Sequence, residues 1–306
     1  MNQRQFTHLR FRQLMLIASL GETGNLHHSS KLCSMTQPTA TRLLRDSEMI
    51  LGVPLFERHA RGMTPTAFGQ DAIIFSQRIM AQLEIFQEDL SAKREGGHGV
   101  LVIGAIMGAA PQFLARAVTA MKQELPLLTI RIFGETSDRV MEMLERGEIE
   151  FAIGRFSGAM QHNELTFEPL ASEPLSFVVR DGNPLIEVAP TRLEQLSNVS
   201  WVLQPESTIA RQLLEAEFAA RDMTTPGNRV EVSSIFAALQ LVRHSDGVAM
   251  LSRPVVEDYL TTGLLRELPL QIAWKLSDFG ILTRRGGSLS HFAQLLATHL
   301  KQVSDK

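Results

Sequence analysis

The sequence predicts an α/β protein in three parts: a small all-α N-terminal domain, one long helix, and a bilobed α/β domain. Three observations support this prediction. Short helical segments fill the first 65 residues, and apolar residues then recur at intervals of three and four up to residue 90. From residue 100 onwards, strand-like and helix-like segments alternate. With 306 residues and 44% hydrophobic content, the chain is long enough for each part to bury a core.

Positive charge is concentrated at the N-terminal end, although the formal net charge is −3. Residues 1–66 contain eight Lys and Arg against four acids, a balance of +4, whereas the remaining 240 residues contain 22 basic and 29 acidic side chains, a balance of −7. This asymmetry favours a polyanionic partner for the N-terminal domain. The single cysteine, Cys33, excludes an intrachain disulfide, and we expect it to fill the core.

Three helices are expected in the N-terminal domain. The first starts near Phe11 and the second covers about residues 25–33, and Ser34 and Met35 form a short turn after it. Thr36 suits the N-cap of the third helix, and the proline two residues later is tolerated because its missing N–H would have no partner there. Two helices joined by so short a turn are typical of a helix-turn-helix.

A hairpin is expected after the third helix. Residues 53–66 contain two prolines and basic residues between apolar ones, which predicts a two-stranded wing with its tip near residues 60–62. In winged helix-turn-helix domains the start of the recognition helix meets base edges, while arginine and lysine contact phosphates. The expected DNA-binding residues are Gln37, Pro38, Thr39, Thr41, Arg42 and Arg45 in the recognition helix, and Arg58, His59 and Arg61 in the wing.

One continuous amphipathic helix of roughly 28 residues, about 42 Å long at 1.5 Å per residue, is expected after Thr66. A helix this long with one apolar face needs a partner, and the simplest is the same helix of a second subunit. Such a homodimer would place two DNA-binding domains on a pseudo-palindromic site. The expected dimerisation residues are Phe68, Ala72, Phe75, Ile79, Leu83, Phe86 and Leu90.

The C-terminal part is predicted to consist of two similar lobes. A glycine-rich stretch, residues 96–99, ends the long helix and is expected to act as a hinge. Strands and helices then alternate as βαβαβ up to residue 154, which predicts a parallel sheet flanked by helices. A second such series covers residues 175–251.

A ligand site is expected in the cleft between the lobes, because open α/β sheets bind ligands beyond the carboxyl ends of their strands. Arg155 either pairs with an anionic ligand or neutralises Glu135. The expected lining is Ile106, Met107, Gly108, Glu135, Thr136, Arg155, Gln204, Ser207, Ser233, Ser234, Ile235 and Arg253.

Residues 29–69 resemble the LysR-type family of bacterial transcriptional regulators. Thr41 stands where serine is usual, and Ser47 replaces the usual leucine. Two segments, residues 52–69 and 167–185, look most like the branch with regulators of aromatic-acid catabolism and of galactose-binding-protein operons. The residues in register with the family pattern are Leu32, Gln37, Pro38, Glu48, Leu51, Gly52, Leu55, Phe56, Arg58, Thr64, Pro65, Thr66 and Gly69.

This resemblance implies a ligand-responsive transcriptional regulator that binds double-stranded DNA, forms a homodimer or homotetramer, contacts RNA polymerase and uses no cofactor or metal. The effector would be an aromatic or organic acid or a sugar-type metabolite. The loop at residues 106–110 lacks the hydroxyl found in many acid-sensing relatives, which weakens the case for a carboxylate. The C-terminal domain would resemble periplasmic binding proteins, and residues 281–300 would complete its first lobe.

The implied domains are a winged helix-turn-helix at 1–65, a linker helix at 66–95 and an effector-binding domain at 96–306. Within the last, lobe I would cover about 98–172 and 275–306, and lobe II about 173–274.

Two alternatives stay open: a constitutive DNA-binding regulator without an inducer, and a ligand-binding α/β protein or enzyme. The sequence contains no P-loop, no H-E-x-x-H and no G-x-S-x-G, so we expect no catalysis. No apolar run reaches the ~18 residues of a membrane helix, and the N-terminus lacks the apolar core of a signal peptide. We therefore expect a cytoplasmic protein without membrane contact.

Overall fold

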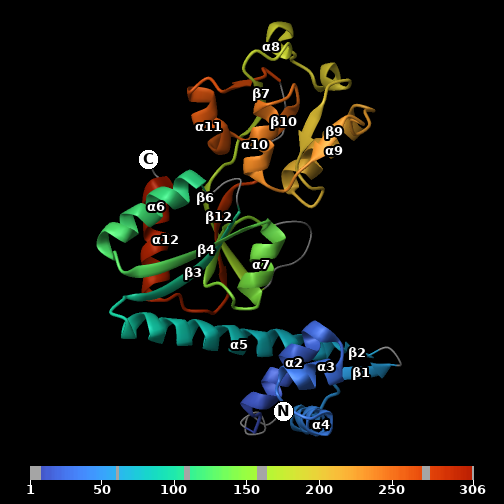
Figure 1. The fold of residues 1–306 in the computed structure, drawn as a ribbon, viewed down its shortest axis with the longest axis vertical. Coiled ribbons are helices and arrows are strands. Elements are labelled where there is room, and N and C mark those ends of the chain that lie inside the picture. Colours follow the sequence, from blue (N-terminus) through green and yellow to red (C-terminus); the bar gives the residue numbers. More distant parts are fainter. Residues whose placement is uncertain (1–7, 60–61, 107–110, 157–163, 271–275, 305–306) are drawn as a thin grey trace. The chain divides into compact units, whose positions relative to one another are not determined.

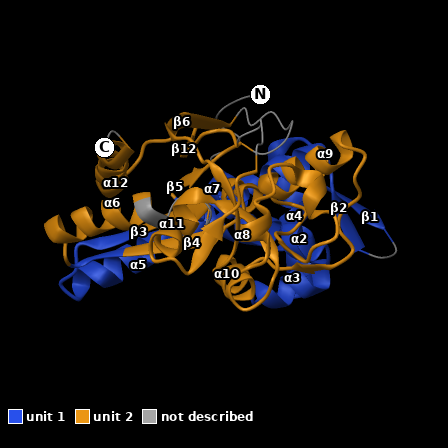
Figure 2. Ribbon diagram, turned by 90° about the horizontal axis from the view of Figure 1, so that it is seen from above, with its two compact units in different colours: residues 1–100, 127–129, 142–149 blue, residues 101–126, 130–141, 150–306 orange. Residues whose placement is uncertain are grey.

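The fold is α/β, as expected, in a computed structural model that describes residues 8–59, 62–106, 111–156, 164–270 and 276–304 (Figure 1). The chain divides into two compact units (Figure 2). One holds residues 1–100 with 127–129 and 142–149, and the other holds residues 101–126, 130–141 and 150–306. No helix in the described part of the chain is both long and apolar enough to cross a membrane.

Capping side chains set the helix boundaries in the first unit. The side-chain oxygens of Thr36 and Thr66 accept hydrogen bonds from the backbone N–H groups of Thr39 and Gly69, at 3.4 and 3.0 Å. The expected N-cap Thr36 is therefore confirmed, and Thr66 caps the long helix that was expected after it. The elements are α2 (Phe11–Thr23), α3 (Leu26–Leu32), α4 (Gln37–Leu51), β1 (Phe56–His59), β2 (Gly62–Pro65) and α5 (Ala67–Arg94).

The hairpin β1–β2 is fixed to the helices by buried contacts. The Glu48 carboxylate, on α4, accepts hydrogen bonds from the backbone N–H groups of Leu55 and Phe56, at 2.9 and 3.3 Å. A Cβ atom at Gly69 would lie 1.9 Å from the Leu55 carbonyl oxygen, so the start of α5 packs directly on the chain before the hairpin. The core comprises Leu16, Ile17, Leu20, Leu26, Ala40, Leu44, Leu55, Phe56, Met63 and Ile73.

Helix α5 contacts the turn at residues 145–147. Arg78 Nε donates a hydrogen bond to the carbonyl oxygen of Glu145, and Gln82 Nε2 donates to that of Gly147 at 3.1 Å. The helix has the expected 28 residues and ends just before Gly96, whose φ of 85° lies in the left-handed region that glycine tolerates.

The first five-stranded sheet has the strand order β4-β3-β5-β12-β6, in which β12 is antiparallel to both β5 and β6. The C-terminal strand thus joins the first sheet, and the final helix packs on α6. The elements are β3 (Gly99–Ile106), α6 (Pro111–Glu124), β4 (Leu128–Glu135), α7 (Ser137–Glu145), β5 (Phe151–Gly154), β6 (Leu165–Ala171), β12 (Phe279–Arg284) and α12 (His291–Ser304).

The second sheet has the order β11-β7-β10-β8-β9, in which β7 is antiparallel to β10 and β11. Its elements are β7 (Leu175–Arg180), α8 (Leu185–Val188), η1 (Leu193–Leu196), β8 (Trp201–Leu203), α9 (Ile209–Ala220), β9 (Arg229–Glu231), α10 (Ile235–Arg243), β10 (Val248–Ser252), α11 (Arg253–Thr261) and β11 (Leu265–Glu267).

The expected parallel arrangement is confirmed for only part of each sheet, because both sheets are mixed. Strands β3 and β5 are parallel, as are β8 and its neighbours β9 and β10, and these strands follow helical crossovers. In contrast, β7 and β12 enter their sheets from segments of the other sheet. No helical crossover then imposes a parallel direction on them.

The substitution Gly69→Ala is expected to destabilise the N-terminal domain by about 1–3 kcal/mol, because the added methyl group would clash with the Leu55 carbonyl. Hydrogen exchange of the α2 and α4 amides in the full chain measures this effect. Gly227→Ala is the matched control, since a Cβ there meets no atom within 4 Å. Equal exchange in both variants would contradict the close packing.

Candidate functional site

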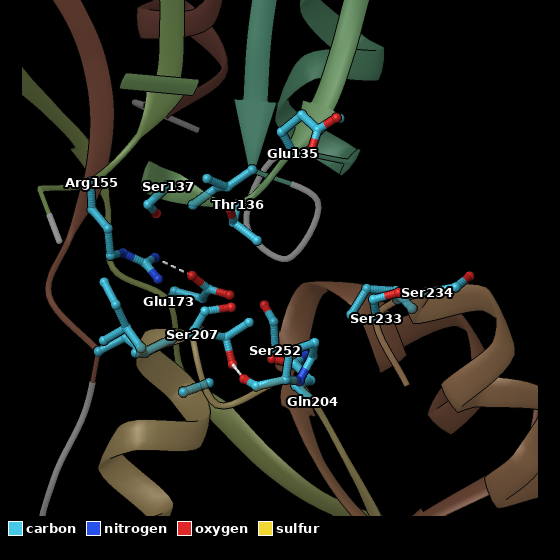
Figure 3. A pocket seen from close by; sticks show the side chains of 18 of the residues that line it. Glu135, Thr136, Ser137, Arg155, Glu173, Gln204, Ser207, Ser233, Ser234 and Ser252 are labelled. Atoms are coloured by element: carbon cyan, nitrogen blue, oxygen red, sulfur yellow. Dashed lines mark hydrogen bonds and ion pairs between the residues drawn. The ribbon is translucent and has the colours of Figure 1, made fainter. Parts of the chain in front are cut away.

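A cavity of about 440 Å³ opens in the second unit, where strand ends from both sheets meet (Figure 3). Its volume falls within the range of small-molecule sites, about 300–1,000 Å³. Met107 and Gly108 lie outside the described residues. Nine expected residues line the cavity: Ile106, Glu135, Thr136, Arg155, Gln204, Ser207, Ser233, Ser234 and Ile235.

The expected lining is corrected at Arg253, which does not contribute to the cavity. Its guanidinium forms ion pairs with Glu257, at 2.7 Å, and with Glu267. The hydrogen bond that Arg253 donates to Glu257 and the charge of Glu267 raise the pKa of Arg253 above its ordinary value. Ser252 lines the cavity instead, because successive residues at a strand end point to opposite sides.

The charged centre of the cavity is a buried ion pair. Arg155 Nη2, just after β5, donates a hydrogen bond to Glu173 Oε2, on the connection between β6 and β7. The two residues are only 5% and 4% exposed. The sequence pattern pointed to Glu135 as a partner of Arg155 and gave no indication of Glu173. The available signal was an acidic residue two positions before the buried strand β7.

Two buried polar atoms of the cavity have no hydrogen-bond partner among the described residues: Arg155 Nε and Ser252 Oγ. Ser252 is 4% exposed and lies among the labelled lining residues in Figure 3. An unsatisfied buried polar group costs about 1–3 kcal/mol, and most such groups in native proteins are paired. These two atoms therefore provide places for ligand or water hydrogen bonds.

The predicted recognition helix presents its polar residues outward. Gln37, Pro38, Arg42 and Arg45 are exposed on α4. Thr39 and Thr41 are half-buried, and their hydroxyl groups bond locally, to the Thr36 hydroxyl at 2.9 Å and to the Gln37 carbonyl at 3.0 Å. The side chains free to meet a groove are thus the amide and the two guanidinium groups.

The predicted wing forms as the antiparallel hairpin β1–β2. Arg58 and His59 are exposed on β1, and His59 Nε2 lies 2.8 Å from the Thr64 hydroxyl. Arg61 lies outside the described residues.

The apolar face of α5 is open to solvent in the single chain. Phe68, Phe75 and Phe86 are 56%, 52% and 55% exposed, and Ile79, Leu83 and Leu90 are exposed as well. Ala72 is half-buried. A hollow of about 340 Å³ beside α2 and α5 has Phe68, Ala72 and Phe75 in its lining. The seven predicted dimerisation residues therefore form a surface that a partner could cover.

Two family descriptions match the chain. The bacterial regulatory helix-turn-helix protein of the lysR family matches residues 11–70, and the LysR substrate binding domain matches residues 94–305. The chain belongs to the LysR family of transcriptional regulators. The resemblance drawn from the sequence is thus confirmed, and the family consists of regulators rather than enzymes.

Curated relatives of this LysR-family regulator match it over nearly its whole length. GbpR of Azospirillum brasilense is 32% identical over 298 residues, which cover 97% of this chain and 87% of GbpR. GalR of Pseudomonas putida is 28% identical, over 95% of this chain and 73% of GalR.

Solved LysR-family structures share the fold. A full-length OxyR variant from Pseudomonas aeruginosa matches with a TM-score of 0.61 at 21% identity, covering 96% of this chain and 98% of OxyR. CbnR, described as a LysR family transcriptional regulator, matches with a TM-score of 0.60 at 20% identity, covering 97% and 100%.

Cys33 is expected to react slowly with iodoacetamide at pH 7.5. Burial raises the pKa of its thiol above the ordinary 9.0, against smaller opposing effects from Ser19 and Arg12, and only the thiolate is reactive. The alkylation rate should therefore rise with pH up to and beyond pH 9. Alkylation of the native chain at pH 7.5 as fast as that of the chain unfolded in guanidinium would contradict this assignment.

Proposed function

We propose that this LysR-family regulator binds promoter DNA through residues 1–65 and responds to a small metabolite bound in its cavity. The observation that carries the proposal is the cavity itself, with two buried polar atoms that lack partners. In this proposal residues 66–95 link the subunits and residues 96–306 bind the effector. The effector is an aromatic or organic acid or a sugar-type metabolite.

In this proposal, exposed side chains of α4 and of the wing contact the DNA. Glutamine can pair bidentately with adenine, which suits Gln37, and arginine pairs with guanine or phosphate, which suits Arg42 and Arg45. Arg58 and His59 would reach the backbone or minor groove. The solved complex of CbnR with its target DNA, whose CbnR chain matches this one with a TM-score of 0.59, supports the assignment.

The exposed face of α5 supports a homodimer. A contiguous apolar surface of this kind in water favours association, and the same helix of a second copy offers a complementary one. Pairing would set two DNA-binding domains on a pseudo-palindromic promoter site, and two such dimers would form a homotetramer. Effector binding would change the spacing of these domains and the DNA bend, and hence the contact with RNA polymerase.

A constitutive regulator that binds no inducer is the alternative. The buried atoms without partners favour the effector-responsive form. Leaving such atoms unpaired costs free energy, and a bound ligand would supply the missing hydrogen bonds. Ligand titration of the full chain separates the two.

The double substitution Gln37→Ala with Arg42→Ala is expected to weaken binding to the upstream promoter fragment at least tenfold at physiological salt. Each lost base contact is worth about 1–3 kcal/mol. Gel shift or fluorescence anisotropy measures the loss. Arg192→Ala, an exposed arginine of the second sheet's lobe, is the charge-matched control. Unchanged binding in the double variant would show that α4 is not the recognition helix.

The substitution Phe75→Asp is expected to shift the full chain toward monomer at micromolar concentration, because it places a charge in the exposed apolar face of α5. Sedimentation velocity measures the change. Gln70→Asp adds the same charge on the opposite side of the helix and should leave the assembly intact. Dimers that persist in the Phe75 variant would place the subunit contact elsewhere.

A further inference from the structure

We infer that the cavity takes a neutral, hydroxyl-rich molecule of monosaccharide type rather than a carboxylate. This inference rests on the proposed function, in which the cavity binds an effector, and it narrows the effector from acids and sugars to neutral polyols. The observation that carries it is the ion pair between Arg155 and Glu173 inside the cavity.

The buried part of the cavity is electrically balanced. Arg155 is the only cationic side chain among the described lining residues, and Glu173 already neutralises it. A carboxylate ligand at Arg155 would bring a second negative charge beside Glu173, where little water screens the repulsion. A cationic ligand would face Arg155 in the same way, and the other lining carboxylate, Glu135, is exposed. A neutral ligand meets neither penalty.

Polyol hydroxyl groups match the hydrogen-bonding capacity that the ion pair leaves open. A hydroxyl donates one hydrogen bond and accepts others, so neighbouring hydroxyls can accept from Arg155 Nε and donate to Glu173 at the same time. The ion pair stays intact. Ser252 Oγ, buried and unpartnered, can donate to or accept from a further ligand hydroxyl.

The remaining lining suits the alternating faces of a sugar ring. The hydroxyl groups of Thr136, Ser207 and Ser233 line the cavity from separate segments and form no hydrogen bond with other described residues. Ile106 and Leu276 add apolar surface. Hydroxyls around the rim of a ring can meet the polar groups while its C–H faces contact the apolar ones.

Helix N-termini at the cavity are the main feature that would favour an anion. Helices α9 and α10 begin there, and the cap of each helix occupies one of its first-turn amides. Thr208 accepts from the N–H of Arg211, and Ser234 accepts from that of Ala237, both at 3.3 Å. The remaining first-turn amides can donate to the oxygen of a neutral hydroxyl group as well as to an oxyanion, so they do not select an acid over a polyol.

Isothermal titration of the full chain with matched ligand pairs tests the inference. D-glucose, D-galactose and myo-inositol are the neutral probes, and D-glucuronate, D-galacturonate and benzoate are the acids. At least one neutral probe should bind ten times more tightly than any of the acids. Tighter binding of an acid would overturn the inference and leave the proposed effector function standing. If none of the six probes binds, the inference about neutral ligands is also overturned. The proposed effector function is overturned only if a broad metabolite library produces no thermal shift.

Substitutions connect the preference to the ion pair. Glu173→Gln leaves the Arg155 charge unpaired and should shift the neutral-to-acid affinity ratio at least tenfold toward the uronate. Arg155→Gln with Glu173→Gln keeps the cavity neutral and should retain the wild-type preference. If circular dichroism shows that Glu173→Gln alone does not fold, the double variant is compared with the wild type instead.

Ser252→Ala should weaken the neutral ligand about tenfold without changing the preference. Ser172→Ala, on the same connection as Glu173 but outside the lining, is the control and should bind as the wild type. An unaltered preference in folded Glu173→Gln protein would show that the ion pair does not select the ligand.

Discussion

The ion pair between Arg155 and Glu173 constrains the C-terminal half of the molecule. Arg155 follows β5 of the first sheet, and Glu173 lies where the chain passes from that sheet to the second. Desolvating two charges is costly unless they stay paired, so the pair fixes this connection relative to the end of β5. The pair lies in the lining of the cavity, together with hydroxyl-bearing residues from the other strand ends.

In the N-terminal domain, one partly buried interaction of a carboxylate with the backbone has a comparable role. Glu48 sits on the same helix as the predicted DNA-binding residues, and its carboxylate holds the backbone at the start of the wing. Helix α4 and the hairpin β1–β2 are thus connected through one side chain as well as through the core. Glu48 and the core residues hold α4 and the hairpin together, so the side chains predicted to contact DNA can remain exposed.

Local sequence signals predicted much of the fold and less of the site. Thr36 and Thr66 identified two helix starts because capping is a local interaction, and the periodicity of α5 gave its full length. The antiparallel direction of β7 and β12 was missed because it depends on which distant segment a strand joins, not on the pattern of the strand itself. Glu173 was missed for the same reason: its partner lies 18 residues away, across a strand that the sequence pattern did not reveal.

Helix α7 lies between the cavity and the turn that α5 contacts. Its first residue, Ser137, lines the cavity, and the carbonyl of its last residue, Glu145, accepts a hydrogen bond from Arg78 of α5. Nine residues of helix span only about 13 Å and behave as a stiff rod. A tilt of that rod at its cavity end would therefore move the carbonyl group that accepts from Arg78 at its other end.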